Sequence, residues 1–393
     1  MVYYIVSIIL TCISYFVPVN KNLYIAGSWF GRKFSDNPKY FYKYVLDSQE
    51  QKTIYWYTRD RLLYNEMRLE GLPVLYGNSI KSIIMHLRAS AVFCSCSPKQ
   101  DLLGVALNNK TIVFNLWHGT PMKKIGFDCI SSGVGISTMG LKDNKNALEK
   151  LLRQYFYSPL KKFVEKKTYI LSPSDEISKI LCGAFKKEEQ DILSLGYPKL
   201  DHLIKTRNSN QNKKAKIFYA PTYRGEYDSE CNILVEYGFV IDDIDVWLRG
   251  KDYYLEIQLH PANRLPNDFL QKINKTERIQ VVSYPDIYEI LNQYQYVITD
   301  FSSIYFDAIS VGIKTIIAPF GLESYLSNDR QLYFSIEELF PYALSKNWPE
   351  LIKNFETYYN LPEISFVLNR FYKYQDGDSC RRLMLAVEKI IGK

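Results

Sequence analysis

The chain has few of the residues that usually mark a metal or disulfide protein. It contains four histidines in 393 residues, and its seven cysteines show neither a disulfide framework nor a zinc-ligand spacing. Cys94 and Cys96 stand two residues apart, and no histidine-rich segment follows them. An odd cysteine count without a pattern is typical of a reducing compartment. We therefore predict no metal site formed by the protein.

The sequence also lacks the common nucleotide-binding fingerprints and a nucleic-acid surface. It has neither a Walker A loop nor a Gly-x-Gly-x-x-Gly motif, which argues against a kinase and against a nicotinamide enzyme. The net charge of +7 is modest for this length, and the densest basic run, residues 161–167, is typical of a solvated helix face. We therefore expect no nucleic-acid partner.

The first charged residue is Lys21, so the amino terminus is an uncharged apolar run. A signal peptide would have basic residues before this run and a small-residue cleavage site after it, and both are missing. The run is slightly short for a membrane span of about 20 residues. Three interpretations stay open: an interfacial helix, a single span, or a buried first strand. We expect residues 1–21 to be a membrane-associating segment.

The remaining chain is typical of a globular protein of two domains. It is 47% hydrophobic and 23% charged, and it is too long for one compact core. Short β-rich runs alternate with helical stretches from residue 22, and the alternation restarts after the polar joint 205–216. We predict an N-terminal domain over 22–205 and a C-terminal domain over 206–375. Residues 376–393 are expected to form a helix that packs back on the N-terminal domain.

Continuous apolar strands with helices between them indicate parallel sheets covered on both faces, and hence an α/β fold of two Rossmann-like domains facing a cleft. Helices are expected from Asn78 and from Asn144. The expected strands are KTIYWYT, LPVLYG, AVFCS, TIVFNLW and YILSPS in the first half, and IFYAPT, YYLEIQLHP, IQVVSYP, YVITD and TIIAPF in the second.

Ligands in such sheets bind beyond the carboxyl ends of the strands, so strand ends give a list of candidate residues. His118 ends the strand 111–117, and His260 ends YYLEIQL. Asp300 ends YVIT, while Thr222 and Arg224 follow IFYA.

The segment WHGTP around His118 has two interpretations. An isolated histidine is often only hydrogen-bonded in a turn, but His118 could also be a general base or a phosphate donor, because histidine titrates near pH 6.5. Gly119, before Thr120, would allow the backbone to approach a ligand. Pro121 could start a helix whose free amides, together with Lys123 and Lys124, attract an anion.

Two further motifs could bind phosphate. Ser302 and Ser303 follow Asp300 at the positions of an N-cap and a first-turn residue, where they could either cap a helix or cradle a phosphate. Arg264 lies four residues after His260, and arginine binds phosphate oxygens in a bidentate manner.

Taken together, these motifs resemble the CDP-glycerol glycerophosphotransferase family, which builds teichoic acids and related capsule polymers. The resemblance rests on NLWHGTPMKKIG, YAPTYRG, QLHP and TDFSSIYFDA in the family's order and spacing, supported by GSWFGRKFSDNPKYFYKYV, LGYPKLD and DGDS, and it covers about residues 27–379. The chain departs from the family at Lys199, where arginine is expected, and at Cys380 after Ser379. These departures bear on the exact substrate.

The resemblance implies a GT-B-like fold, with the nucleotide held mainly by the C-terminal domain and the acceptor in the cleft. It implies transfer of glycerol phosphate from CDP-glycerol to a hydroxyl of a lipid-linked acceptor of the polyprenyl diphosphate type, with release of CMP, at the cytoplasmic face of the cell membrane. His118 and His260 match the catalytic histidines, and Ser302 and Ser303 match the pyrophosphate-binding turn. We expect the donor-binding set to be Ser302, Ser303, Arg264, Thr222, Arg224 and Asp300, supported by Gly119, Thr120, Lys123 and Lys124.

Other functions stay open at this point. The donor could be CDP-ribitol or another CDP-polyol, and the enzyme could be a GT-B glycosyltransferase. A different class is a catalytically inactive, membrane-bound assembly protein. No cofactor is implied beyond the donor substrate, and a loosely held Mg²⁺ stays open. The sequence does not identify the acceptor, the number of units added, or a wall or capsular polymer.

Overall fold

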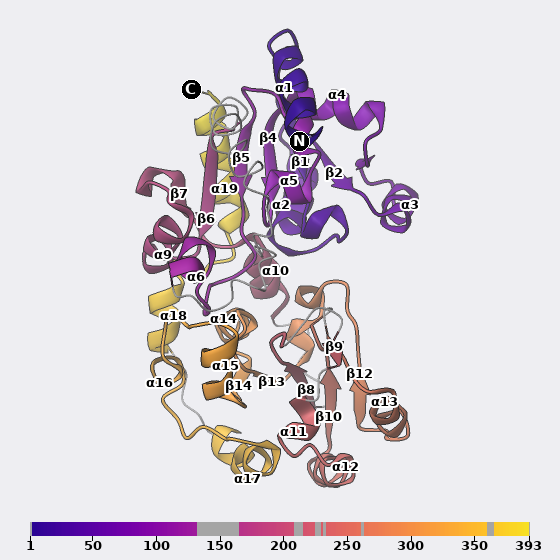
Figure 1. Ribbon diagram of the computed structural model, residues 1–393, viewed down its shortest axis with the longest axis vertical. Helices are drawn as coiled ribbons and strands as arrows, with labels where there is room; N and C mark the ends of the chain where they lie inside the picture. The colour runs from indigo at the N-terminus through magenta and orange to yellow at the C-terminus, as the bar shows by residue number, and fades with distance from the viewer. Residues whose placement is uncertain are drawn as a thin grey trace, which may run out of the picture.

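The computed structural model describes residues 2–131, 165–207, 215–224, 229–230, 233–260, 263–359 and 365–392. Two parallel β-sheets, each with helices on its faces, form two domains that are stacked along the long axis of the molecule (Figure 1). The predicted α/β class and the two parallel sheets are confirmed. The helix expected from Asn144 lies largely outside the described residues.

The first domain contains a seven-stranded sheet in the order β3-β2-β1-β4-β5-β6-β7. Neighbouring strands pair in parallel, and the inner strands are almost entirely buried, as their continuous apolar sequences predict. The strands are β1 (Asn20–Ala26), β2 (Thr53–Thr58), β3 (Val74–Tyr76), β4 (Ala89–Cys94), β5 (Ile112–Asn115), β6 (Thr168–Ser172) and β7 (Ile192–Ser194).

Side-chain caps fix where several first-domain helices begin. Asp60, Ser79, Ser97 and Ser174 each accept a hydrogen bond from a backbone amide of the first turn. The helices are α1 (Val2–Ser14), α2 (Asp36–Asp47), α3 (Arg61–Leu69), α4 (Ile80–Arg88), α5 (Pro98–Asp101), α6 (Gly126–Ser131), α9 (Asp175–Phe185) and α10 (Pro198–Thr206), with 3₁₀ turns η1 (Trp29–Gly31), η2 (Gly104–Ala106) and η4 (Glu189–Asp191).

The second domain contains a five-stranded parallel sheet in the order β12-β10-β8-β13-β14 and a two-stranded ribbon of β9 and β11. Its strands are β8 (Ala215–Ala220), β9 (Ser229–Glu230), β10 (Tyr253–Ile257), β11 (Asn263–Arg264), β12 (Ile279–Val281), β13 (Tyr296–Thr299) and β14 (Lys314–Ile317). Its helices are α11 (Ile233–Glu236), α12 (Ile241–Lys251), α13 (Asn267–Ile273), α14 (Ile304–Ser310), α15 (Leu322–Asn328), α16 (Ile336–Leu339) and α17 (Trp348–Tyr359), with η6 (Ile287–Glu289) and η7 (Leu291–Gln293).

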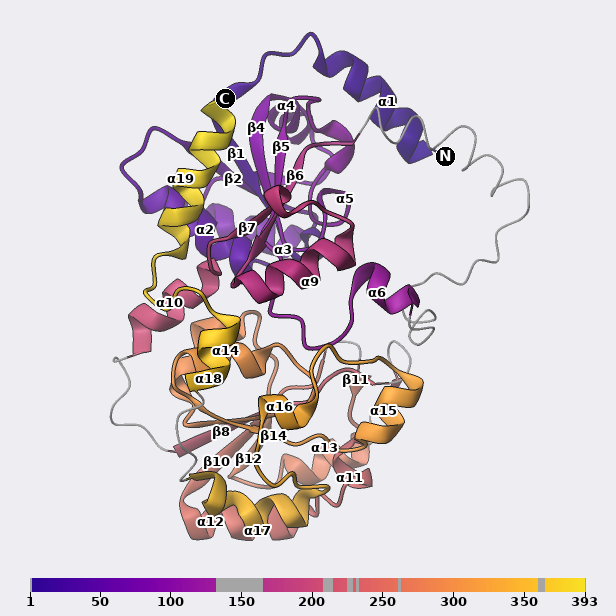
Figure 2. The same cartoon turned by 90° about the vertical axis from the view of Figure 1, so that its left-hand side faces the viewer.

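The chain returns to the first domain at its carboxyl end. Helix α18 (Ser365–Phe371) contacts α14 of the second domain and α9 of the first, and α19 (Ser379–Gly392) packs on α2, α10 and β4 (Figure 2). The Asp201 carboxylate accepts hydrogen bonds from the amides of Ser379 (2.9 Å) and Cys380 (2.7 Å). Asp201 therefore anchors the start of α19 in the first domain.

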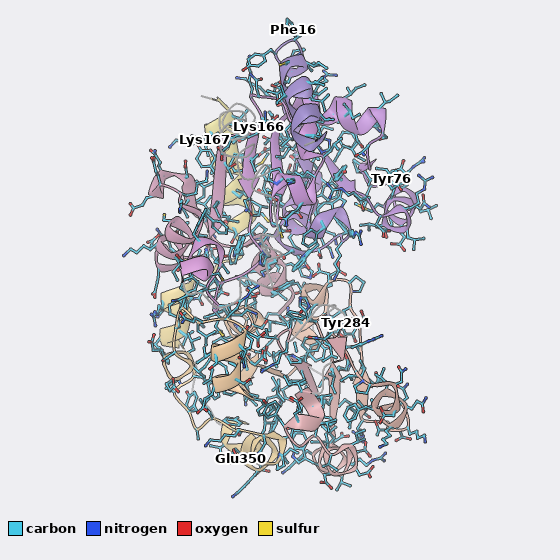
Figure 3. The ribbon with its side chains drawn as sticks, in the orientation of Figure 1. Phe16, Tyr76, Lys166, Lys167, Tyr284 and Glu350 are labelled. Atoms are coloured by element: carbon cyan, nitrogen blue, oxygen red, sulfur yellow. The ribbon has the colours of Figure 1, made fainter. Side chains whose placement is uncertain are left out.

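The amino-terminal run forms helix α1, so the interpretation as a buried first strand is wrong. The helix lies along η2, and the Asn108 side chain donates hydrogen bonds to the carbonyls of Ser14 and Val17, both at 3.1 Å. In the described part of the chain, no helix is both long enough and apolar enough to cross a membrane. Ile9 (53%), Ile13 (44%) and Phe16 (89%) are exposed, and Phe16 stands at the end of the first domain that faces away from the second (Figure 3).

Candidate active site

His118 lies just beyond β5, on a loop whose backbone is fixed by unusual geometry. Trp117 takes a left-handed conformation (φ 53°), and its amide donates to Asn115 Oδ1 at 2.9 Å. His118 Nδ1 lies 3.2 Å from the carbonyl oxygen of Ser95. Because a carbonyl can only accept, Nδ1 carries the proton and Nε2 keeps its lone pair. His118 is therefore arranged to accept a proton at Nε2.

The surroundings of His118 keep it neutral at physiological pH. Burial lowers its pKa to about 4; the bond to Ser95 acts in the opposite direction, while the charges of Lys199 and Lys123 lower it further. In the structure, burial is the larger cause, and Lys199 contributes as well as Lys123.

Asp101 organises the loop that carries Ser95. Its Oδ2 atom accepts hydrogen bonds from the amides of Ser95 (2.9 Å) and Cys96 (2.7 Å), and its Oδ1 atom accepts from the amide of Phe30 (2.9 Å). One buried carboxylate thus links the hydrogen-bond partner of His118 to the loop after β1. Asp101 is a positioning residue, since none of these bonds involves His118 itself.

Gly119 brings the His118 loop against the serine turn of the second domain. A Cβ atom added to Gly119 would lie 2.6 Å from Ser303 Oγ and 2.8 Å from Ser303 Cβ. Only glycine allows this approach, which is to a serine of the other domain, whereas the sequence suggested an approach to a ligand. Ser303, not Ser302, is the N-cap of α14, and it makes no side-chain capping bond. The prediction that placed Ser302 at the N-cap is therefore wrong by one residue.

Lys199 joins the two domains beneath His118. Its ammonium group is fully buried and lies 2.9 Å from the His118 carbonyl oxygen, 2.9 Å from Asp307 Oδ2 and 2.6 Å from the Tyr288 hydroxyl. Asp36 Oδ1 is 3.8 Å away, and burial raises the pKa of Asp36 to about 7, against the opposing charge of Lys199. Asp307 is therefore the main counter-ion of Lys199.

Asp300 is buried at the end of β13 and is saturated by protein donors. Its carboxylate accepts from the Thr222 amide (2.8 Å) and hydroxyl and from the Phe301 amide (2.6 Å), and it pairs with Arg224 Nη2 at 2.9 Å. The strand-end rule thus brings Thr222, Arg224 and Asp300 together. Asp300 therefore fixes the orientation of the Thr222 and Arg224 side chains.

Lys123 contributes to a cluster of cations beside this group. Burial lowers its pKa to about 8; Asp300 raises it, while Arg330 and Arg224 lower it. The loop of Lys123 pairs with the chain around Leu332, and Lys124 Nζ donates to Gln331 Oε1 at 2.8 Å. No helix starts at Pro121, because this pairing holds the loop in extended form, so that prediction is wrong.

His260 and Arg264 lie on the exposed side of the second domain. His260 follows β10, and its ring lies 5.4 Å from that of Tyr223. Partial burial of the imidazole, together with the charges of Lys123 and Lys33, lowers the pKa of His260 to about 4. Arg264 is in β11 and is exposed, and its neighbour Asn263 is hydrogen-bonded to the backbone of Arg224.

The match to a known family agrees with this arrangement. The family model described as CDP-Glycerol:Poly(glycerophosphate) glycerophosphotransferase matches residues 9–389. The chain belongs to this family. It is thus a transferase of the CDP-glycerol glycerophosphotransferase type, and the predicted enzyme class is confirmed.

Two curated relatives extend the comparison. The teichoic acid glycerol-phosphate transferase of Staphylococcus aureus (strain NCTC 8325 / PS 47) is 26% identical over 396 residues, which cover 94% of each chain. The teichoic acid poly(glycerol phosphate) polymerase of Bacillus subtilis (strain 168) is 25% identical, and the match covers 95% of this chain and 49% of the polymerase. The chain therefore spans about half the length of that polymerase.

A solved structure has the same fold as this chain. The wall teichoic acid polymerase TagF superposes with a TM-score of 0.73 at 21% identity, over 99% of this chain and 94% of that one. At this level of identity, the likeness supports the two-domain architecture alone.

Several residues around His118 and Lys123 in this chain gave no usable signal in the sequence. Arg330 lies in the polar stretch SNDRQL, and Lys199 attracted attention only as a departure from the family pattern. Ser95 directly follows β4, so a stricter use of the strand-end rule would have found it. Within the described ranges, no three His, Cys, Asp or Glu side chains are grouped so that they could hold a metal ion.

Proposed function

We propose that the enzyme transfers glycerol phosphate from CDP-glycerol to a hydroxyl of a membrane lipid-linked acceptor, with release of CMP, in teichoic acid or capsular polymer biosynthesis. The observation that carries this proposal is the position of His118. His118, whose Nε2 is unprotonated, lies on a loop that contacts Ser303 at Gly119. The cations Lys123 and Arg224 are close to this contact. A base thus adjoins a group of phosphate-binding side chains.

In the proposed reaction, the acceptor hydroxyl oxygen attacks the β-phosphorus of CDP-glycerol. His118 Nε2 takes the hydroxyl proton, a new P–O bond forms to the acceptor, and the bond between the β-phosphorus and the bridging oxygen breaks. The electron pair of that bond leaves with CMP. His118 then passes its proton to solvent, for which its low pKa is favourable.

The second domain, together with Lys123 of the first, supplies electrostatic stabilisation for this transfer. Arg224 and Lys123 place positive charge near the phosphates, and the hydroxyls of Ser302 and Ser303 donate hydrogen bonds to the pyrophosphate. His260, with a pKa of about 4, is neutral at pH 7 and acts as a hydrogen-bond donor, with Arg264 as a further cation at the exposed edge. Phosphoryl transfer depends mainly on such positioning and charge stabilisation.

Activity assays separate this function from its alternatives. Purified enzyme should release CMP from CDP-glycerol in the presence of an acceptor, and should do so more efficiently than from CDP-ribitol. Preference for CDP-ribitol would reassign the polyol, and turnover of UDP-sugars would indicate a glycosyltransferase. Absence of CMP release from any CDP-polyol would support the inactive assembly protein.

A peripheral location at the cytoplasmic face of the membrane completes the proposal. The exposed apolar side chains of α1 and the following turn are suited to an interfacial position. Exchanging Ile9 and Phe16 for Glu should move the protein to the soluble fraction. Leu62→Glu, at a 73% exposed position of α3, is the matched control and should leave the distribution unchanged. If the Ile9 and Phe16 variant stays with membranes, the attachment lies elsewhere.

A further inference from the structure

The loop between β1 and α2 has a strained and firmly held backbone. Trp29 (φ 45°), Phe30 (φ 61°) and Gly31 (φ 68°) are all left-handed, which non-glycine residues rarely adopt. Ser28 Oγ donates to the Lys33 carbonyl at 3.0 Å. Such strain persists only where the surroundings over-determine the conformation.

The bonds that hold this loop come from the same residues that position His118. The Trp29 amide donates to Ser95 Oγ at 3.2 Å, and the Phe30 amide donates to Asp101 Oδ1 at 2.9 Å. Ser95 also provides the carbonyl that binds His118 Nδ1. Ser95 and Asp101 therefore fix the position of the loop relative to His118.

Two side chains of the loop stand beside the base. The Trp29 ring centroid lies 5.7 Å from that of His118, and Lys33 Nζ lies 6.0 Å from the Trp29 ring. Trp29 is half-buried and Lys33 is exposed. Among the described residues, Lys33 forms no ion pair at contact distance, and the Asp286 carboxylate, which pairs with Lys39, acts on it from further away. Lys33 is also close enough to His260 to lower the pKa of that histidine.

We infer that Trp29 and Lys33 form a binding site for the acceptor, and that this site takes a sugar or polyol unit with an adjacent phosphate. This inference rests on the proposed function, because the base must meet the hydroxyl that it deprotonates. The indole face packs against the carbon face of the sugar or polyol, and the ammonium group pairs with the phosphate. The donor is bound from the opposite domain, so the two substrates approach His118 from different sides.

The test measures steady-state kinetics of the full chain with CDP-glycerol and a water-soluble saccharide diphosphate that carries a short prenyl chain. Lys33→Gln should raise the acceptor KM about ten-fold, with the donor KM and kcat unchanged. Arg32→Gln is the matched control, since Arg32 is the adjacent exposed cation of the same loop. The acceptor KM of the native enzyme should also rise with ionic strength, and Lys33→Gln should remove most of this rise.

Variants of the aromatic side chain test the other half of the site. Trp29→Ala should raise the acceptor KM about ten-fold, and Trp29→Phe, which keeps an aromatic face, should restore most of the affinity. Phe30→Ala is the control for backbone strain, because Phe30 has the same left-handed conformation, whereas the ring of this loop that contacts His118 in the described structure is that of Trp29. Equal effects of Phe30→Ala and Trp29→Ala on the acceptor KM would overturn the role of Trp29.

A second acceptor distinguishes the source of the phosphate. It carries one glycerol phosphate unit at the end of the same saccharide. If Lys33→Gln impairs only this acceptor, the lysine binds the glycerol phosphate; if it impairs both, it binds the diphosphate. An unchanged acceptor KM in both the Lys33 and Trp29 variants, with native turnover intact, would overturn the inference alone. Native enzyme that releases no CMP would overturn the proposed function and this inference with it.

Discussion

The two domains present their site residues in different ways. On the first domain, His118 is half-buried and is tied to Ser95 and, through its carbonyl, to Lys199. On the second domain, His260 and Arg264 are exposed, and Ser303 makes no capping bond although it stands at a helix start. The proposed base is thus fixed before any substrate arrives, whereas His260 and Arg264 of the second domain are accessible from solvent.

This difference indicates a division of labour. A general base needs accurate orientation and a defined tautomer, which buried hydrogen bonds provide. A nucleotide-binding surface must lose its product after each turnover, and exposed groups that bind through charge and hydrogen bonds are suited to release. The following experiments test whether the two domains differ in this way.

The largest effect is expected at His118. His118→Asn keeps a side chain that can bond to Ser95 but cannot accept a proton, so kcat should fall by about 10²–10⁴-fold while CDP-glycerol binding and the fold are retained. The rate of the native enzyme should decline only as the pH falls toward about 4, because the base form of His118 persists down to its pKa. Near-normal turnover of a folded His118→Asn variant would transfer the role of base to His260.

A substitution of Lys199 tests whether the fixed orientation of His118 depends on the contact between the domains. Lys199→Met would leave Asp307 buried without its counter-ion, and breaking a buried pair costs about 3–5 kcal/mol. Denaturant unfolding should show this loss, and kcat should fall because the His118 carbonyl loses its donor. Lys43→Met removes an exposed lysine of an interdomain pair and should change stability by less than about 1 kcal/mol. Equal effects of the two variants would contradict the importance of the buried pair.

His86 has a lowered pKa like His118, but we assign it no part in catalysis. It is fully buried, its Nδ1 donates to the Ser82 carbonyl at 2.7 Å, and its Nε2 accepts from the Leu103 amide at 3.3 Å, with Tyr57 and Arg59 nearby. Burial lowers its pKa to about 4, below the usual 6.5, so the unfolded chain binds the proton first as the pH falls. The stability that His86 contributes is complete above pH 6.5 and is lost progressively toward pH 4, by on the order of 3 kcal/mol.

His86→Gln should flatten this pH dependence of the unfolding free energy without changing the pH profile of kcat. His118, His202 and His260, whose pKa values are also lowered, should contribute to the remaining slope, and Asp36, whose pKa is raised to about 7, should act in the opposite direction. A change in the pH profile of kcat in this variant would show that His86 acts on the site.

The smallest effect is expected for Ser302 and Ser303 of the second domain. Replacing Ser302 and Ser303 by Ala removes two hydroxyl donors and leaves the backbone amides, so kcat/KM for the donor should fall about ten-fold. Thermal stability should hardly change, since Ser303 makes no capping bond and the hydrogen bond from the Ile304 amide to Ser302 Oγ is long, at 3.5 Å. Unchanged kinetics with reduced stability would show that the serines serve only the fold.

The sequence predicted best what local chemistry determines. Parallel strands end at the same edge, so the rule for strand ends located His118, Thr222 and Asp300 without a structure. It could not show that Lys199 meets Asp307, because the two are 108 positions apart and buried pairing leaves no local pattern. The contact of Gly119 with Ser303 depends in the same way on how the domains meet.

The amino terminus was ambiguous for a physical reason. An uncharged run whose few polar residues are Ser7, Thr11 and Ser14 gives only a weak periodic signal, so the sequence left both a strand and a helix open. The strand β1, which begins with the polar residues NKN, was missed for the opposite reason, because its first three residues are exposed and only its last four are buried.

The return of the chain through α18 and α19 has a consequence for synthesis on the ribosome. The second sheet is complete once β14, which ends at Ile317, has emerged, whereas the surfaces of α2 and α10 stay uncovered until α19 has been made. We expect the later-encoded domain to reach its native state as a unit before the earlier one. A nascent chain arrested before Ser379 would therefore expose the apolar surface of the first domain to chaperones and proteases.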